Sequence, residues 1–444
     1  MPGTEVTAVA HPTSAFDRCF ALVDCNNFFA SCEQVFNPKL NNQPVVVLSS
    51  NDGCIVARSN EAKALGIGMG EPFFQYRHTI EKHRVNVFSS NFPLYADMSR
   101  RIMAILTRFA PKMEIYSIDE AFLDLRGCDH LTRCDNLTEY ARTIRATLKQ
   151  WTGISVSIGI ARTQTLAKIA SHLAKRSIKA RGVLDLTDSP FVDQALESVK
   201  VGDVWGVGRR TVEWFIGRGI TNAKQLRDID DKTITGRMGI MGLRLVYELR
   251  GISCFSLTTC PSPSKTIISS QSFGQKTTSL EKARGAVATH VTIAAAKLRS
   301  QHLATNALAV FLMTNHSAEK FGRNNHSVAI DLPKATNNTA ELIHHAMQGT
   351  DMAYRKGHIY AKAGIMLSNL IPECHVQTTL FGTDHHTKNG RKLMDVVDRV
   401  NTSMGRGTLQ YAVQLQALSS RARCEHGRRR YTTNWKELAI VNAQ

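Results

Sequence analysis

The order of apolar and polar positions predicts a chain in which strands and helices alternate. Short apolar runs over 20–24, 44–48 and 154–160 have the length of strands, and amphipathic segments over 95–109 and 137–151 have the length of helices. Side chains alternate between two faces of a strand but recur every 3.6 residues on a helix, which separates the two kinds of segment. The pattern therefore predicts a protein of the α+β class.

Acidic residues end two of the predicted strands. The apolar run 114–118 leads into Asp119 and Glu120, and the run 20–23 leads into Asp24. Carboxylate oxygens suit Mg²⁺, and two such ions about 4 Å apart can hold the attacking and leaving oxygens of a phosphoryl transfer. For the acidic pair alone, an exposed hairpin tip with ordinary surface acids is the alternative.

Charge favours the metal interpretation. The 444 residues include 55 Lys and Arg against 37 Asp and Glu, a formal charge of +18, which indicates a polyanionic partner such as nucleic acid. An acidic cluster in such a basic chain is unexpected unless cations or catalysis require it. The length predicts two to four domains. No apolar run is long enough to span a bilayer, and we expect no signal peptide at the N-terminus.

The helix expected after Thr163 or Thr165 has two distinct faces. Lys168 and Lys175 are seven residues apart and share one face. An apolar stripe at helical spacing forms the other face: Leu166, Ile169, Ala170 and Leu173. Two ammonium groups beside a metal centre would hold a triphosphate, whereas a solvated lysine face is the alternative.

A Gly-x-Gly turn lies between two helical segments beyond the boundary near 185–190. Gly206 and Gly208 precede Arg209 and Arg210. The exposed backbone N–H groups of such a turn can bind a phosphate oxygen, and the arginines strengthen this interpretation. The alternative is that the glycines only end a helix.

The segment after a Pro- and Ser-rich linker at 260–265 predicts a β-α-β-β-α-β unit. Its elements are expected at 267–273, 280–301, 306–314, 327–332, 339–356 and 360–370. From Pro372 onward the chain is polar, and we expect it to be irregular.

Three ordered motifs carry a resemblance to a known family. They are Asp24-x-Asn26-x-Phe28-Phe29-Ala30-Ser31-Cys32-Glu33, Ser49-Ser50-Asn51-Asp52-Gly53-Cys54 and Tyr116-Ser117-Ile118-Asp119-Glu120-Ala121-Phe122. With these motifs the chain resembles the Y-family translesion DNA polymerases, and within that family the UmuC-like catalytic subunits. The likeness covers about residues 19–435.

The resemblance implies a right-hand polymerase fold of the α+β class. Its expected parts are a palm (19–29 and 92–186), small fingers (30–91), a helical thumb (187–254), a linker (255–266), a little finger (267–371) and a clamp- and partner-binding tail (372–444). Residues 1–18 have no counterpart in the family, and we expect them to be a disordered extension.

The resemblance also implies roles for single residues. Two Mg²⁺ ions would be held by the metal set Asp24, Asp119, Glu120 and the Cys25 carbonyl. Phe29 would be the steric gate, an aromatic ring that rejects a 2′-hydroxyl. Nucleotide contacts would come from Phe28, Phe29, Asn60, Lys63 and Lys175, and DNA contacts from Gly206, Gly208 and Arg209. Many relatives carry Tyr and Arg in place of Asn60 and Lys63. Asp124 and Lys168 are expected to be structural.

The function implied is error-prone translesion synthesis, in the cytoplasm, in an SOS-type response to DNA damage. The substrates would be primer-template DNA and deoxynucleoside triphosphates. The tail segment containing Gln377, Leu380 and Phe381 is similar to the peptide by which bacterial polymerases bind the sliding clamp. A processed UmuD-type dimer and a RecA filament are further implied partners. The alternative is a non-catalytic DNA- and clamp-binding factor that keeps the polymerase fold.

Overall fold

The chain forms two compact units. The computed structural model describes residues 19–126, 136–259, 263–314, 325–377, 384–405, 407–420 and 424–438. Among these, the first unit contains residues 19–47, 54–259 and 427–438, and the second contains 48–53 and 263–426. Within the described ranges, no helix combines the length and the apolar composition that crossing a bilayer requires.

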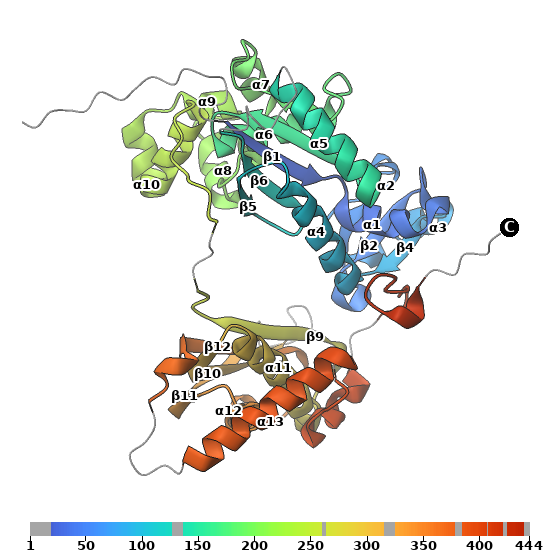
Figure 1. Ribbon diagram of the computed structural model, residues 1–444, viewed down its shortest axis with the longest axis vertical. Helices are drawn as coiled ribbons and strands as arrows, with labels where there is room; N and C mark the ends of the chain where they lie inside the picture. Colours follow the sequence, from blue (N-terminus) through green and yellow to red (C-terminus); the bar gives the residue numbers. More distant parts are fainter. Residues whose placement is uncertain are drawn as a thin grey trace, which may run out of the picture. The chain divides into compact units, whose positions relative to one another are not determined.

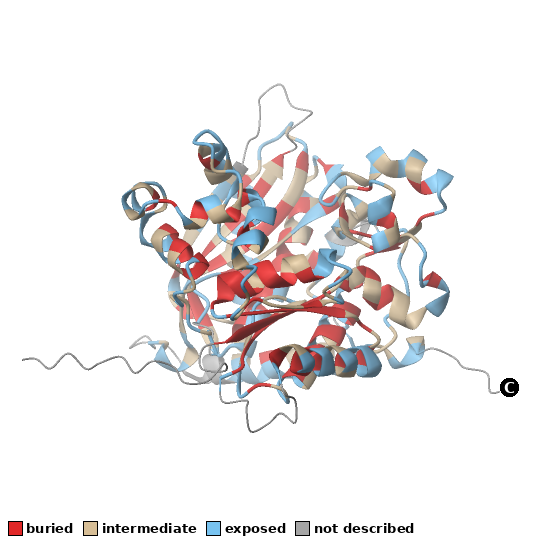
Figure 2. Cartoon of the chain, turned by 90° about the horizontal axis from the view of Figure 1, so that it is seen from above, coloured by how far each residue is buried: buried red, intermediate tan, exposed pale blue. Residues whose placement is uncertain are grey.

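A five-stranded sheet lies at the centre of the first unit, and its strands come from the two segments predicted as the palm. The strand order is β5-β6-β1-β7-β8, antiparallel except for the β7–β8 pair. Both β1 and β7 are buried along their whole length. Figure 2 colours the buried residues of the chain red. The strands are β1 (Phe20–Cys25), β5 (Lys112–Ile115), β6 (Glu120–Asp124), β7 (Val156–Ala161) and β8 (Val183–Asp185).

Helices pack on both sides of this sheet. The N-terminus of α5 is capped by Asn136, whose side chain accepts a hydrogen bond from the Glu139 N–H, and Gly153 ends the helix with a φ of 73°. Thr163 caps α6 in the same way, which decides between the two caps considered from sequence. These helices are α1 (Phe28–Phe36), α4 (Phe92–Leu106), α5 (Leu137–Thr152) and α6 (Gln164–Arg176).

The segment predicted as the fingers holds a small sheet with the order β3-β2-β4. Its elements are β2 (Val45–Leu48), β3 (Ile55–Arg58), α2 (Asn60–Ala64), α3 (Arg77–Lys82) and β4 (Asn86–Ser89). The six residues 48–53 belong to the second unit, so the predicted fingers are not one continuous part of the first unit.

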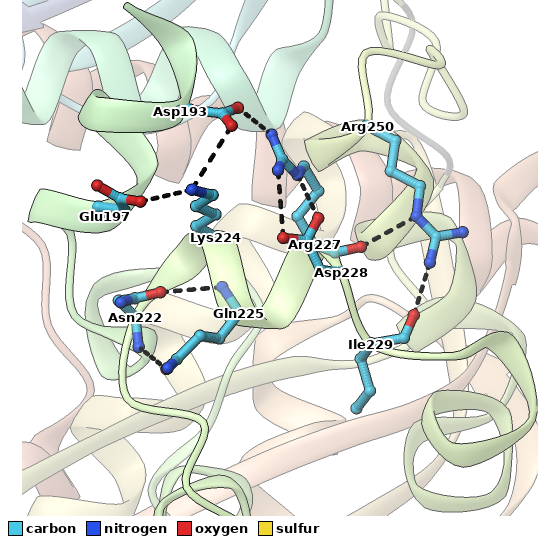
Figure 3. Close-up of polar contacts among 9 residues, drawn as sticks. All are labelled: Asp193, Glu197, Asn222, Lys224, Gln225, Arg227, Asp228, Ile229 and Arg250. Carbon is cyan, nitrogen blue, oxygen red and sulfur yellow. Dashed lines mark hydrogen bonds and ion pairs between the residues drawn. The ribbon is translucent and has the colours of Figure 1, made fainter.

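The segment predicted as the thumb is helical. Asn222 and Gln225 form a reciprocal capping box at the start of α9, and Asp193 on α7 pairs with both Lys224 and Arg227 on α9 (Figure 3). These contacts fix short helices that would be marginal alone. The helices are α7 (Val192–Ser198), α8 (Arg209–Ile216), α9 (Ala223–Arg227) and α10 (Asp231–Leu249).

The second unit has the predicted β-α-β-β-α-β order. Its antiparallel sheet has the strand order β11-β10-β12-β9, and two helices pack against it around a shared apolar core. The elements, shown in Figure 1, are β9 (Ile267–Thr277), α11 (Leu280–Ser300), β10 (Leu303–Thr314), β11 (Asn325–Thr336), α12 (Thr339–Ala353) and β12 (Tyr360–Pro372).

The expectation of an irregular segment after Pro372 is wrong. Residues Asp384–Ser403 form a long helix, α13, and Ala412–Ser420 form a 3₁₀ segment. Arg299 on α11 forms an ion pair with Asp398 on α13 at 2.7 Å, and Tyr411 packs against the core of the second unit. The helix was not predicted because most of its residues are polar, and only one of its faces packs against the second unit.

Candidate active site

The antiparallel pairing of β1 and β6 brings the predicted acids to one edge of the buried sheet. Asp24 and Glu120 are direct partners in the register. The Cys25 N–H donates to the Asp119 carbonyl at 2.9 Å, so Asp119 lies at the same end of β1 as Glu120. Asp24 therefore meets an acidic pair almost a hundred residues further along the chain, at the point where β1 ends and β6 begins.

A serine orders the turn between β5 and β6. The Ser117 hydroxyl donates to Asp119 Oδ1 at 2.6 Å and accepts from the backbone N–H groups of Asp119 at 3.2 Å and Glu120 at 3.0 Å. Such local bonds hold a turn in one conformation. Ser117 was not predicted from sequence to have a role, although its place two residues before the acidic pair was a signal.

The lysine face of α6 points at these acids. Lys168 Nζ lies 3.1 Å from Glu120 Oε2, and Lys175 Nζ forms an ion pair with Asp24 Oδ2. The two lysines share one face of α6, as the sequence predicts, and each contacts one of the acids. That they hold a triphosphate stays a prediction. Lys168 was expected to be structural, yet it contacts Glu120 directly and lies 4.0 Å from the centre of the Tyr116 ring.

Burial makes the acidic edge sensitive to cations. Asp24 is 7% exposed, and this burial raises its pKa to about 7. The charge and hydrogen bond of Lys175 oppose the rise, whereas the neighbouring Glu120 adds to it. A cation placed between the two carboxylates would therefore relieve both the burial cost and their mutual repulsion.

The donor set fits hard divalent cations. The carboxylates and the Cys25 carbonyl offer only oxygen atoms, which hard cations prefer. Asp24 and Glu120 already pair with the ammonium groups of Lys175 and Lys168, so positive charge is favoured at this position. Among the described residues, no three His, Cys, Asp or Glu side chains are arranged as a ready metal-ligand set. Mg²⁺ completes its shell with water and substrate phosphates, so a full protein cage is not required.

An aromatic stack stands at the start of α1. The rings of Phe29 and Tyr95 are stacked, with centroids 4.5 Å apart and planes at 13°, and Phe92 meets Phe29 edge-on at 6.1 Å. The Tyr95 hydroxyl donates to Glu33 Oε1 at 2.8 Å. Phe29 is half-buried, whereas Phe28 is buried in the core, so a nucleotide contact at Phe28 would have to come from its backbone.

Asn60 and Lys63 on α2 form a polar cluster with a residue that the sequence analysis missed. Lys63 Nζ donates to Asn27 Oδ1 at 2.6 Å, and Asn27 Nδ2 donates to Asn60 Oδ1 at 3.0 Å. Burial lowers the pKa of Lys63, and the charges of Arg58 and Lys175 lower it further. The cluster thus lies within electrostatic reach of the lysine that contacts Asp24.

The Gly-x-Gly turn leads directly into α8. Gly206 has a φ of 85°, which favours glycine, and Gly208 is the residue that precedes the first turn of the helix. The Arg209 side chain is 95% exposed. Next to the turn, Trp205 Nε1 donates to the Tyr116 hydroxyl at 2.9 Å, which connects this region to the β5–β6 turn.

Other predicted residues lie away from the acidic edge. Asp124 lies at the opposite end of β6 and pairs with Arg126, and its structural role stays a prediction. Gln377 is exposed, and Leu380 and Phe381 lie outside the described residues.

Comparisons with known proteins show the family of the chain. The impB/mucB/samB family matches residues 23–172, its C-terminal domain matches 264–380, and a domain of unknown function matches 391–441. The chain is 40% identical to Protein UmuC of Salmonella typhimurium strain LT2 over 95% of this chain and 100% of that protein. It is 38% identical to Protein ImpB of Salmonella typhimurium over 95% of this chain and 99% of that protein.

More distant relatives share part of the chain. DNA polymerase IV of Treponema denticola is 30% identical over 53% of this chain and 58% of that protein. Among solved structures, a Y-family DNA polymerase chimera of Dbh and Dpo4 superposes with a TM-score of 0.62 at 21% identity, covering 80% of this chain and 99% of that chain. The fold is therefore that of a Y-family polymerase. By its family match and its likeness to UmuC over 95% of this chain, the protein belongs to the impB/mucB/samB family of Y-family DNA polymerases.

Proposed function

We propose that the acidic edge formed by Asp24, Asp119 and Glu120 is the site at which this error-prone translesion DNA polymerase transfers nucleotides. The observation that carries the proposal is the register pairing of Asp24 with Glu120, with Lys175 and Lys168 facing them. The likeness to Protein UmuC and to a DNA polymerase IV supports a polymerase activity at this site. The non-catalytic alternative is not favoured, because it leaves a buried acid pair and its two lysines without a purpose.

The proposed ligands of two Mg²⁺ ions are the three carboxylates and the Cys25 carbonyl. Bound Mg²⁺ would supply charge stabilisation and would lower the pKa of the attacking hydroxyl. Ser117 holds Asp119 through its hydroxyl, which keeps this ligand in one orientation. Lys175 contacts Asp24 and would exchange this contact for a triphosphate oxygen when substrate binds.

Substrate selection is proposed for residues beside the acidic edge. The half-buried Phe29 ring, stacked on Tyr95, would lie under the sugar and reject a 2′-hydroxyl by steric clash. Asn60 and Lys63 would contact the triphosphate, and the hydrogen bonds through Asn27 hold them together. The cluster has one ammonium group from Lys63 and an amide from Asn60, so we expect a looser hold on phosphate than a Tyr and Arg pair would give.

DNA and protein partners are proposed for the basic and terminal parts of the chain. The formal charge of +18 favours a polyanion, and the turn at Gly206, Gly208 and Arg209 would bind backbone phosphate. We assign sliding-clamp binding to the segment Gln377–Phe381. A processed UmuD-type dimer, a RecA filament and a cytoplasmic SOS-type setting complete the proposal and rest on the likeness to UmuC.

Primer extension opposite an undamaged and a damaged template tests the proposal. We expect nucleotide addition that requires Mg²⁺ and stops when a chelator is added. The assay should be run with and without a UmuD-type dimer and RecA filament, because the chain could depend on them. Absence of extension under every one of these conditions, with DNA binding retained, would favour the non-catalytic alternative.

A further inference from the structure

The residues that match the domain of unknown function are divided between the two units. Helix α13 belongs to the second unit, whereas residues 427–438 belong to the first. We call residues 428–437 the C-terminal latch. Figure 1 shows this red segment beside the blue strand β4 of the first unit. Nothing in the proposed mechanism uses it.

The latch contacts the first unit through a ring stack, a hydrogen bond and a cation–π contact. The Tyr431 ring stacks on Phe36 with centroids 4.7 Å apart and planes at 11°. The Asn91 side chain donates to the Arg429 carbonyl at 3.0 Å, and the Arg428 guanidinium lies 5.3 Å from the centre of the Phe88 ring. A stack, a hydrogen bond and a cation–π contact together fix both the position and the orientation of the segment.

The latch also has an internal structure. Asn434 Nδ2 donates to Glu437 Oε1 at 2.7 Å, and the Arg430 N–H donates to Glu437 Oε2. The Thr433 N–H donates to the Arg430 carbonyl at 3.1 Å. Glu437 thus closes the segment into a compact turn that presents Tyr431 to Phe36.

The elements under the latch are those that carry the aromatic stack. Phe36 is the last residue of α1, which also carries Phe29, and Asn91 directly precedes α4, which carries Tyr95. Between these two helices lies the buried Glu33, which accepts a hydrogen bond from the Tyr95 hydroxyl. Burial raises the pKa of Glu33 to about 7, and the Tyr95 hydrogen bond and the charge of Arg428 oppose that rise. The latch therefore contacts both helices and acts electrostatically on the group between them.

We propose that the C-terminal latch is a positioning element for the steric gate: it holds the end of α1 and the start of α4 so that Phe29 stays stacked on Tyr95. This inference rests on the gate function proposed for Phe29. It assigns part of the domain of unknown function a role in sugar discrimination. Loss of the latch frees α1 and α4 to shift, and a gate that depends on steric clash loses selectivity when its ring can move.

The test compares Tyr431→Ala with Tyr431→Phe in the full-length chain, using the ratio of kcat/KM for a ribonucleotide to that for the matching deoxyribonucleotide. We expect Tyr431→Ala to raise this ratio about threefold or more, with the change mainly in the KM for the ribonucleotide. Tyr431→Phe keeps the stacked ring and should match the parent. Trp435→Ala is the matched control, since this side chain of the same segment is 89% exposed.

A second variant guards against a folding defect at Tyr431. Glu437→Ala opens the latch without touching α1 or α4, and it should raise the same ratio in the same direction by a smaller factor. If both variants lower kcat/KM for the two sugars equally, or leave both unchanged, the latch has no part in sugar choice and the inference is overturned.

Phe29→Ala separates this inference from the gate proposal. If Phe29→Ala leaves the sugar ratio unchanged, the gate assignment itself is wrong. If Phe29→Ala raises the ratio but Tyr431→Ala does not, only the latch inference is wrong. When both raise it, the double variant should be no less selective than Phe29→Ala alone, because both changes act through the same ring.

Discussion

The central sheets of the two units differ in how much of their surface is exposed to solvent. In the first unit β1 and β7 are buried at every position, with helices packed on both faces of the sheet. In the second unit only Ile267, Phe273 and Thr277 of β9 are buried, and much of the remaining strand is polar and exposed. One sheet is covered on both sides, and the other has a side that stays open.

This difference suits the sheet of the first unit to catalysis and the exposed face of the second sheet to binding. Charged groups at the end of a buried strand are held rigidly and partly desolvated, so the field of Lys175 and Glu120 acts strongly on Asp24. An exposed polar face has no such field, but it offers area to a large partner. We therefore expect changes in the first unit's sheet to alter rate and selectivity, and changes at exposed residues to alter affinity.

The largest effect is expected at the acidic edge. Asp119→Ala should lower the rate of nucleotide addition by about a hundredfold or more, because charge stabilisation of the transition state is lost. DNA affinity should stay near that of the parent, since it comes mostly from lysine and arginine on phosphates. Single-turnover extension and DNA binding measure the two effects.

Asp24→Ala and Glu120→Ala should behave like Asp119→Ala. Asp188→Ala is the control, because Asp188 is an exposed acid that pairs with Arg162 and is not part of the acidic edge. Extension by any of the three variants above about a hundredth of the parent rate would exclude the two-metal assignment.

Sugar choice is expected to change next most strongly. Phe29→Ala removes the ring that we place under the sugar, so kcat/KM for ribonucleotides should rise about tenfold relative to that for deoxyribonucleotides. Steady-state kinetics with the two sugars measure the ratio. An unchanged ratio would make Phe29 an ordinary packing partner of Tyr95.

The tail segment should affect affinity alone. Replacing Leu380 and Phe381 by Ala should weaken clamp binding by about tenfold or more, about 1.4 kcal/mol. The two side chains would bury apolar surface worth roughly 3–6 kcal/mol gross, part of which is lost in ordering the segment. Extension on a short primer without clamp should be unchanged. Equal clamp affinity for parent and variant would place the clamp contact elsewhere.

The smallest effect is expected at the Gly-x-Gly turn. Arg209→Ala removes one exposed charge, so DNA affinity should fall about two- to threefold and the salt dependence of binding should weaken by about one phosphate contact. Binding isotherms at several salt concentrations measure both. Arg142→Ala, at an exposed position of α5, is the control. A rate defect without an affinity defect would contradict a phosphate-binding role.

Several local features of the fold followed from sequence pattern. The strand and helix order of the second unit was predicted with end points that differ by a few residues, because apolar periodicity and polar breaks both depend on neighbours in the chain. The lysine face of α6 was predicted correctly, since residues seven apart share a helix face. Helix α13 was missed because its partner, Arg299, comes from a distant element.

The site itself was only partly visible in the sequence. The acids were identified by their positions at strand ends, and resemblance supplied the gate and the nucleotide contacts. Ser117 and Asn27 were missed, because their importance lies in hydrogen bonds to Asp119 and Lys63 that no periodicity indicates. The latch was missed for the same reason, since Tyr431 and Phe36 are almost four hundred residues apart.

The sequence by itself determined the basic charge, the family and the element order of the second unit, and it singled out the three acids as candidates, because each depends on local pattern or on ordered motifs. Tertiary structure alone decided that Asp24 faces Glu120, that Lys168 reaches the acidic edge and that the C-terminal residues return to α1. The physical reason is that strand register and helix packing are set by the burial of many side chains together, so no single segment contains that information.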